Sequence, residues 1–185
     1  AAGQLASYIV KLTKGGSHVD VASVGATNGV VQIMDMVADS GTVYATGHTI
    51  GNAQFGTQQV GGAGANDRII FVAELGSNNQ WSWATGSTSG AYQTARSIDM
   101  TGQGALAIAG SFASVDSDGY LASSGSASFG TTTLSSTYLG MVIAGIDTSG
   151  NWLWAEVADG SYNDEGYGIA VMPTGSIVSM GDHCR

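Results

Sequence analysis

The stretch "NQWSWATGS" (residues 79–87) is echoed by "NWLWAEVADG" (residues 151–160) within one chain of 185 residues. Trp81 lies six residues after Leu75, and Trp152 lies six residues after Ile146. The two tryptophans therefore hold the same position relative to the apolar segment that precedes each. Such a doubled phrase indicates one structural unit copied along the chain, or a pair of ligand-stacking sites.

Two further sets of segments recur at matching intervals. The interval from Leu12 to Leu75 equals the interval from Gly47 to Gly110. The next interval is slightly longer, and it too is the same from Leu75 to Ile146 as from Gly110 to Gly181. The segments that end at these residues are "YIVKL" (8–12), "IFVAEL" (70–75), "MVIAGI" (141–146), "TVYATG" (42–47), "ALAIAG" (105–110) and "SIVSMG" (176–181). Identical intervals at two independent anchors predict a single repeat domain over residues 1–185, with units 7–67, 68–138 and an incomplete 139–185.

The middle unit is predicted to form four short strands. They are "RIIFVAEL" (68–75), "QWSWATGS" (80–87), "ARSIDM" leading into "GALAIAGS" (95–111), and "ASFGTTTLS" (127–135). Apolar and polar residues alternate, and Val, Ile, Thr, Tyr and Trp favour strands. Gly and Asn between these segments supply turns. No segment shows a helical period, so the fold is expected to be all-β.

Four short antiparallel strands per repeat indicate a β-propeller-type protein. A closed propeller uses about 4 to 8 blades, and this chain supplies fewer than three units. We therefore expect an incomplete ring that belongs to an assembly or to a longer chain. A β-sandwich and an open β-solenoid are the alternatives, and an open stack would expose strand edges.

The same phrases resemble a known family. "FVAEL…NQWSWATG…GALAIAGSF…FGTTTL" and "VIAGIDTSGNWLWAEVADG…GYGIAV…TGSIVSMG" are similar to the SBBP-type β-propeller repeat of bacterial and marine proteins. The resemblance covers nearly the whole chain, as about two and a half units. It implies propeller blades and no shared catalytic residues. The first unit departs from the pattern, because His18 and Asp20 stand where the others carry tryptophans.

The tryptophans admit two interpretations. Residues two apart on a regular strand share a face, so Trp81 and Trp83 are expected on one side of their strand, and Trp152 and Trp154 likewise. Large aromatic side chains at a repeated position fill the space between neighbouring sheets. The alternative is that these four residues stack on a ligand such as a glycan.

Three other features carry candidate chemistry. Asp116 and Asp118 in "VDSDGY" (115–120) are either turn residues or the start of a Ca²⁺-binding loop, although the bidentate Glu of a full motif is absent. Otherwise no cofactor is expected. Cys184 is the single cysteine, so it cannot form an internal disulfide and is a candidate interchain thiol. His18 with Asp20 is interpreted as an exposed pair rather than a catalytic one, since no nucleophile motif accompanies it.

Charge and composition limit the function. The chain has 5 Lys and Arg against 14 Asp and Glu, for a net charge of −9, which argues against binding nucleic acid. No apolar run reaches membrane-spanning length. We expect a non-catalytic structural or interaction module: a subunit or fragment of an extracellular, lumenal, cell-surface or virion-surface assembly. Its partners would be other protein chains, further copies of itself, or a glycan. A lectin-like carbohydrate-binding module and a fragment of a larger propeller enzyme are the alternatives.

Overall fold

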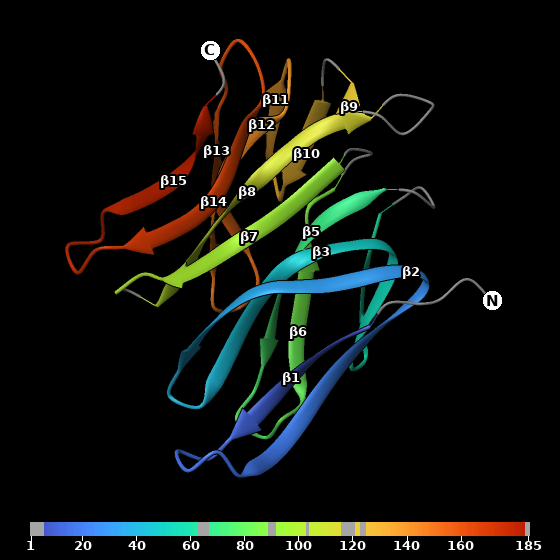
Figure 1. The fold of residues 1–185 in the computed structure, drawn as a ribbon, viewed down its shortest axis with the longest axis vertical. Coiled ribbons are helices and arrows are strands. Elements are labelled where there is room, and N and C mark those ends of the chain that lie inside the picture. The colour runs from blue at the N-terminus through green and yellow to red at the C-terminus, as the bar shows by residue number, and fades with distance from the viewer. Residues whose placement is uncertain are drawn as a thin grey trace.

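The computed structural model describes residues 6–62, 67–88, 92–102, 104–115, 121–122 and 125–183. These residues form strands and turns without a helix, as Figure 1 shows, which confirms the predicted all-β class. No part of the described chain forms an apolar helix of membrane-spanning length. The strands fall into hairpins that recur in the order of the sequence repeats.

Three outer hairpins contain the apolar segments, and the second and third also contain the tryptophan phrases. They are β1 (Ser7–Leu12) with residues 18–27 of β2 (His18–Asp39), β5 (Arg68–Leu75) with β6 (Trp81–Gly86), and β12 (Gly140–Asp147) with β13 (Trp152–Ala158). Their turns have one residue at positive φ in the same place: Gly16 (82°), Asn79 (60°) and Gly150 (86°). Glycine and asparagine tolerate that conformation best, which explains the turn sequences.

Three inner hairpins alternate with the outer ones. They are residues 30–39 of β2 with β3 (Thr42–Phe55), β7 (Tyr92–Met100) with β8 (Ala105–Val115), and β14 (Asp164–Val171) with β15 (Ile177–His183). The first strand of each inner hairpin carries one extra, unpaired residue at the same place in the register: Met34, Arg96 and Tyr167. A bulge kept at one register position in three hairpins bends each strand in the same way.

Each inner hairpin pairs with the outer hairpin of the next repeat. Gly47 of β3 lies opposite Phe71 of β5, and Gly110 of β8 lies opposite Val142 of β12. Two four-stranded antiparallel sheets result, which we call the first sheet (30–50, β5 and β6) and the second sheet (β7, β8, β12 and β13). The N-terminal hairpin (β1 with residues 18–27) and the C-terminal hairpin (β14 with β15) remain at the two ends.

The fourth predicted strand is itself a hairpin. "ASFGTTTLS" forms β10 (Gly125–Phe129) and β11 (Thr132–Ser136), which turn at Gly130 with φ of 59°. The end of β3 and β4 (Gln58–Gly61) turn in the same way at Gly56. A two-residue strand, β9 (Leu121–Ala122), pairs with the end of β8. The long strand β2 and one parallel pairing of β5 with β7 join the N-terminal hairpin and the two sheets edge to edge. In the described chain this strand order runs openly from β1 to β13 and does not close.

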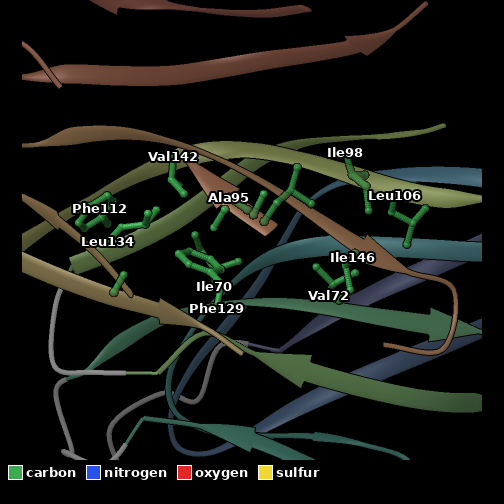
Figure 2. Close-up of a cluster of buried hydrophobic side chains, with 14 of the residues drawn as sticks. Ile70, Val72, Ala95, Ile98, Leu106, Phe112, Phe129, Leu134, Val142 and Ile146 are labelled. Carbon is green, nitrogen blue, oxygen red and sulfur yellow. The ribbon is translucent and has the colours of Figure 1, made fainter. Parts of the chain in front are cut away.

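Apolar side chains fill the spaces between successive layers. Figure 2 shows the largest cluster, in which residues of β5 in the first sheet meet residues of β7, β8 and β12 in the second. Phe129 and Leu134 enter the same cluster from β10 and β11. A second cluster lies between the first sheet and the N-terminal hairpin, around Phe55 and Phe71. On the far side, β14 packs against β7 and β8.

Candidate interaction surface

The tryptophans of each phrase lie on opposite faces of their strand. Leu75 pairs with Trp81 and Glu74 pairs with Trp83, so Ser82 is an extra residue between the two pairs. The same register shift places Leu153 between Trp152 and Trp154. The expectation that two tryptophans share a face is therefore wrong, because a bulge adds half a strand period between them.

Trp81 and Trp152 make the same contacts in successive repeats. Trp81 packs edge-on against Phe55, with ring centroids 5.0 Å apart and planes at 86°. Trp152 packs against Phe129 at 5.0 Å and 81°. The Trp81 indole donates to the backbone oxygen of Ser23 at 3.0 Å, and that of Trp152 donates to the oxygen of Gly86 at 3.4 Å. Each residue therefore links the outer strand of its sheet to the outer strand of the preceding layer.

Trp83 points the other way, toward the following sheet. Its indole nitrogen donates to Glu74 Oε2 and to the backbone oxygen of Thr148, both at 3.0 Å. The ring lies against Gly150, where a Cβ atom would come within 2.9 Å of it. Trp154 has the corresponding position in the second sheet and lies over Gly145. The next turn, which Trp154 would contact by analogy, has no counterpart in the described residues.

The other predicted site residues lie elsewhere. Asp116, Asp118 and Cys184 fall outside the described residues. Across the residues described, no group of three or more His, Cys, Asp or Glu side chains is arranged to hold a metal ion. The acidic residues at the start of β14 make contacts within the chain, since Asp164 accepts from the Gly160 amide and Glu165 pairs with Arg96 at 2.7 Å.

A buried histidine joins the two sheets. His48 of β3 lies 3.1 Å from Thr94 Oγ1 of β7, and its Nε2 lies 2.6 Å from a guanidinium nitrogen of Arg68. Burial, and then the positive charges of Arg68 and Arg96, lower the pKa of His48 to about 3. The same guanidinium nitrogen lies 3.0 Å from Nδ1, and because arginine only donates, at least one ring nitrogen is unprotonated and accepts. His48 is therefore neutral near pH 7 and serves as a polar link between layers.

The outward face of the N-terminal hairpin is apolar and exposed. We call it the N-terminal end surface, and it comprises Tyr8, Val10, Leu12 and Val21. Tyr8 is 70% exposed, although Ile9, on the other face of β1, is buried against the first sheet. A row of large apolar side chains on one face, open to solvent, marks a surface suited to a protein partner.

The C-terminal hairpin presents a second apolar surface at the opposite end. We call it the C-terminal end surface, and it comprises Met172, Val178 and Met180, of which Met180 is 66% exposed. Beside it, between β12–β13 and β14–β15, lies a hollow of about 510 Å³ lined by Met141, Val157 and Gly181 among others. Figure 1 shows the N- and C-terminal hairpins on opposite sides of the two sheets.

Corresponding residues inside the stack are buried. By the interval from Leu12 to Leu75, the N-terminal residues Tyr8, Val10 and Leu12 correspond to Phe71, Ala73 and Leu75, all buried. By the interval from Gly110 to Gly181, the C-terminal residues Val178 and Met180 correspond to Ala107 and Ala109, which have no exposed surface. The two end surfaces therefore consist of residues whose counterparts in the interior of the molecule are buried by a neighbouring layer.

Open backbone edges accompany the apolar surfaces. Among the described residues, β1 pairs only with β2, and β15 pairs only with β14. In the interior, the strands that correspond to β1 pair with the strands that correspond to β15: β5 pairs with β3, and β12 pairs with β8. One long edge of β1 and one of β15 therefore display backbone N–H and C=O groups of the kind that bind an added strand.

The two ends differ in charge. The N-terminal hairpin carries Lys11 and Lys14 against Asp20, a net charge of +1 in a chain of net charge −9. The C-terminal hairpin (164–183) contains Asp164, Glu165 and Asp182 and no Lys or Arg, a net charge of −3, and Glu165 is paired with Arg96 of β7. Opposite charges steer and orient an encounter between two such surfaces.

Comparison with known proteins does not assign the chain to a family. No protein-family model matches the chain, and no curated protein matches it. The resemblance to the SBBP-type repeat therefore stays a prediction. The end surfaces were not predicted from the sequence, because "YIVKL" and "IFVAEL" have the same apolar character whether or not another layer covers them.

Proposed function

We propose that this chain is a non-catalytic, propeller-type repeat module whose function is to assemble protein subunits through its two end surfaces. The proposal is supported by the exposed apolar residues and open strand edges at both ends. A location outside the cell, in a lumen or on a particle surface belongs to the same proposal.

The stacking of the sheets supports the propeller-type arrangement. Each sheet is an antiparallel meander of four strands, and its inner strand packs on the preceding layer: β7 lies against β2 and β3, and β14 lies against β7 and β8. Equivalent strands thus meet equivalent strands, as in a radial array of blades. A plain sandwich would need only two facing sheets, whereas this chain continues the same packing to a further hairpin at each end.

The main support for the proposal is the contrast in solvent exposure between residues at the ends and residues at the same repeat positions in the interior. Leu12 is 55% exposed, whereas Leu75, at the same repeat position, is 4% exposed. Burying a large aliphatic side chain contributes about 1.5–3 kcal/mol. Several such positions at each end provide the driving force for a neighbouring layer to bind.

Sedimentation velocity of the 185-residue chain tests the proposal. We expect particles larger than 18.6 kDa at micromolar concentration, and we expect Leu12→Lys or Met180→Lys to restore the monomer. Leu153→Lys is the matched control, because Leu153 is 53% exposed but lies at the bulge of β13, outside both end surfaces. A monomer throughout the accessible concentration range, or equal effects of all three substitutions, would contradict the proposal.

A further inference from the structure

A groove runs beside the open edge of β1. It has a volume of about 390 Å³, and its lining includes Ile9, Leu12, Met36, Ala38, Val43 and Leu75. A second hollow of about 320 Å³ continues it between β1 and the segment Ile33–Met36. The side chains that face the groove are mostly apolar, so a strand placed there needs apolar residues on the same face.

The interior of the molecule shows what fills the corresponding place. Val43 and Leu75 of the first sheet correspond to Leu106 and Ile146 of the second. These two residues belong to the main core cluster, in which Tyr44 of β3 is buried with them. Tyr44 comes from the strand that pairs with β5. The groove beside β1 is therefore the space that a strand of the β3 type would fill.

We infer that β15 of a second copy of this chain pairs antiparallel with the open edge of β1. This inference rests on the proposed assembly function and specifies its partner. By the registers of β3 with β5 and β8 with β12, Gly181 lies opposite Tyr8, and Ser179 lies opposite Val10. The resulting composite sheet has the order β14, β15, β1 and β2, with the same strand types as the first and second sheets.

The side chains of β15 suit the groove. In this register Val178 takes the place of Tyr44, and Met180 takes the place of the buried Thr46. Both β15 side chains are exposed in the single chain, and both lie on the face that would turn toward Ile9. Valine is smaller than tyrosine and methionine is larger than threonine, so the loss of volume at one position is offset at the other.

Charge and topology favour a second copy as the partner. The net charge of +1 on the N-terminal hairpin meets a net charge of −3 on the C-terminal hairpin, which orients the two ends toward each other. A chain cannot use its own β15 without displacing the two sheets that separate the hairpins (Figure 1). Each copy contributes two complete sheets and one hairpin to each of two composite sheets. Two copies paired head to tail at both ends therefore provide about 6 sheets, within the range of closed propellers.

Disulfide trapping tests the register. Two chains are prepared in a Cys184→Ser background, one with Val10→Cys and the other with Ser179→Cys, and are mixed under mild oxidation. Residues directly opposite on paired strands meet the Cα separation that a disulfide requires. Leu12→Cys mixed with Ser179→Cys is the control: Leu12 is more exposed than Val10 but lies one diagonal step away. We expect the Val10 pair to cross-link about tenfold faster than the control pair.

Amide hydrogen exchange of the natural chain provides an independent readout. We expect the amides of β1 and β15 to become protected as concentration rises, whereas those of β7, already paired, do not change. Equal cross-linking of both pairs, or association without protection of β1 and β15, would overturn the strand pairing and leave the assembly function standing. A chain that stays monomeric in sedimentation would overturn both.

Discussion

The indole nitrogen of Trp83 lies 3.0 Å from the backbone oxygen of Thr148, which joins the outer strand of the first sheet to the outer turn of the second. Trp154 occupies the position in the second sheet that Trp83 occupies in the first sheet. The outer turn of the N-terminal hairpin, Thr13–Ser17, has the same internal hydrogen bonds as the turn Asp147–Asn151. In a composite sheet, the carbonyl oxygen that corresponds to that of Thr148 belongs to Lys14 of a second copy.

The first prediction compares these two tryptophans. Trp83→Phe removes an indole donor that binds within the chain, so it should lower the free energy of unfolding by about 1–2 kcal/mol. Trp154→Phe should change the unfolding of dilute monomer by less than about 0.5 kcal/mol and should weaken self-association about tenfold. Urea unfolding and sedimentation measure the two effects. The reverse assignment of effects would argue against Trp154 as an interface residue.

The second prediction concerns the turn beneath Trp152. A Cβ on Gly130 would lie 3.2 Å from the Cβ of Trp152, and Gly130 has φ of 59°. Gly130→Ala should therefore destabilise the chain by about 2 kcal/mol or more, since both backbone strain and a close contact oppose it. Gly175→Ala is the control: Gly175 has φ of 88° but nothing within 4 Å, so we expect about 1 kcal/mol. Equal losses in thermal unfolding would mean that the tryptophan contact is not tight.

The third prediction concerns pH. The pKa of His48 falls from 6.5 to about 3 on folding, chiefly through burial and then through Arg68 and Arg96. Between these values the unfolded chain takes up a proton that the folded chain does not, so stability falls as pH falls. The contribution of neutral His48 is complete above about pH 6.5 and is lost progressively toward pH 3.

His48→Gln isolates this effect from the titration of carboxylates. The glutamine keeps polar groups near Thr94 but does not titrate. Between pH 7 and pH 4.5, the natural chain should lose about 2 kcal/mol more stability than the variant. Denaturant unfolding at the two pH values provides the comparison. A parallel loss in both proteins would show that His48 is protonated as readily in the folded state as in the unfolded state.

The sequence predicted the repeats and their strand character for a clear physical reason. Matching intervals between Leu12, Leu75 and Ile146 reflect equal positions on successive hairpins, and strand-forming residues alternate around them. The turns were predictable too, because Gly16, Asn79 and Gly150 occupy positions of positive φ.

Two features of the interaction surface could not be predicted in this way. The opposite orientation of Trp81 and Trp83 depends on one extra residue, Ser82, and strand period alone does not reveal a bulge. The exposure of Tyr8 depends on which layer lies beside it, whereas its sequence neighbours resemble those of buried Phe71. The sheets also combine halves of two sequence repeats, because backbone pairing follows the meander rather than the repeat boundary.

Measuring the native mass of the particle by light scattering or sedimentation tests the central claim most directly. Pairing of β15 with β1 at both ends of two copies predicts a discrete particle of twice 18.6 kDa, about 37 kDa. Because the predicted pairing uses backbone edges and apolar side chains, the particle should persist in reductant. A stable 18.6 kDa monomer at high concentration would contradict the account, since the exposed end surfaces would then have no affinity for each other.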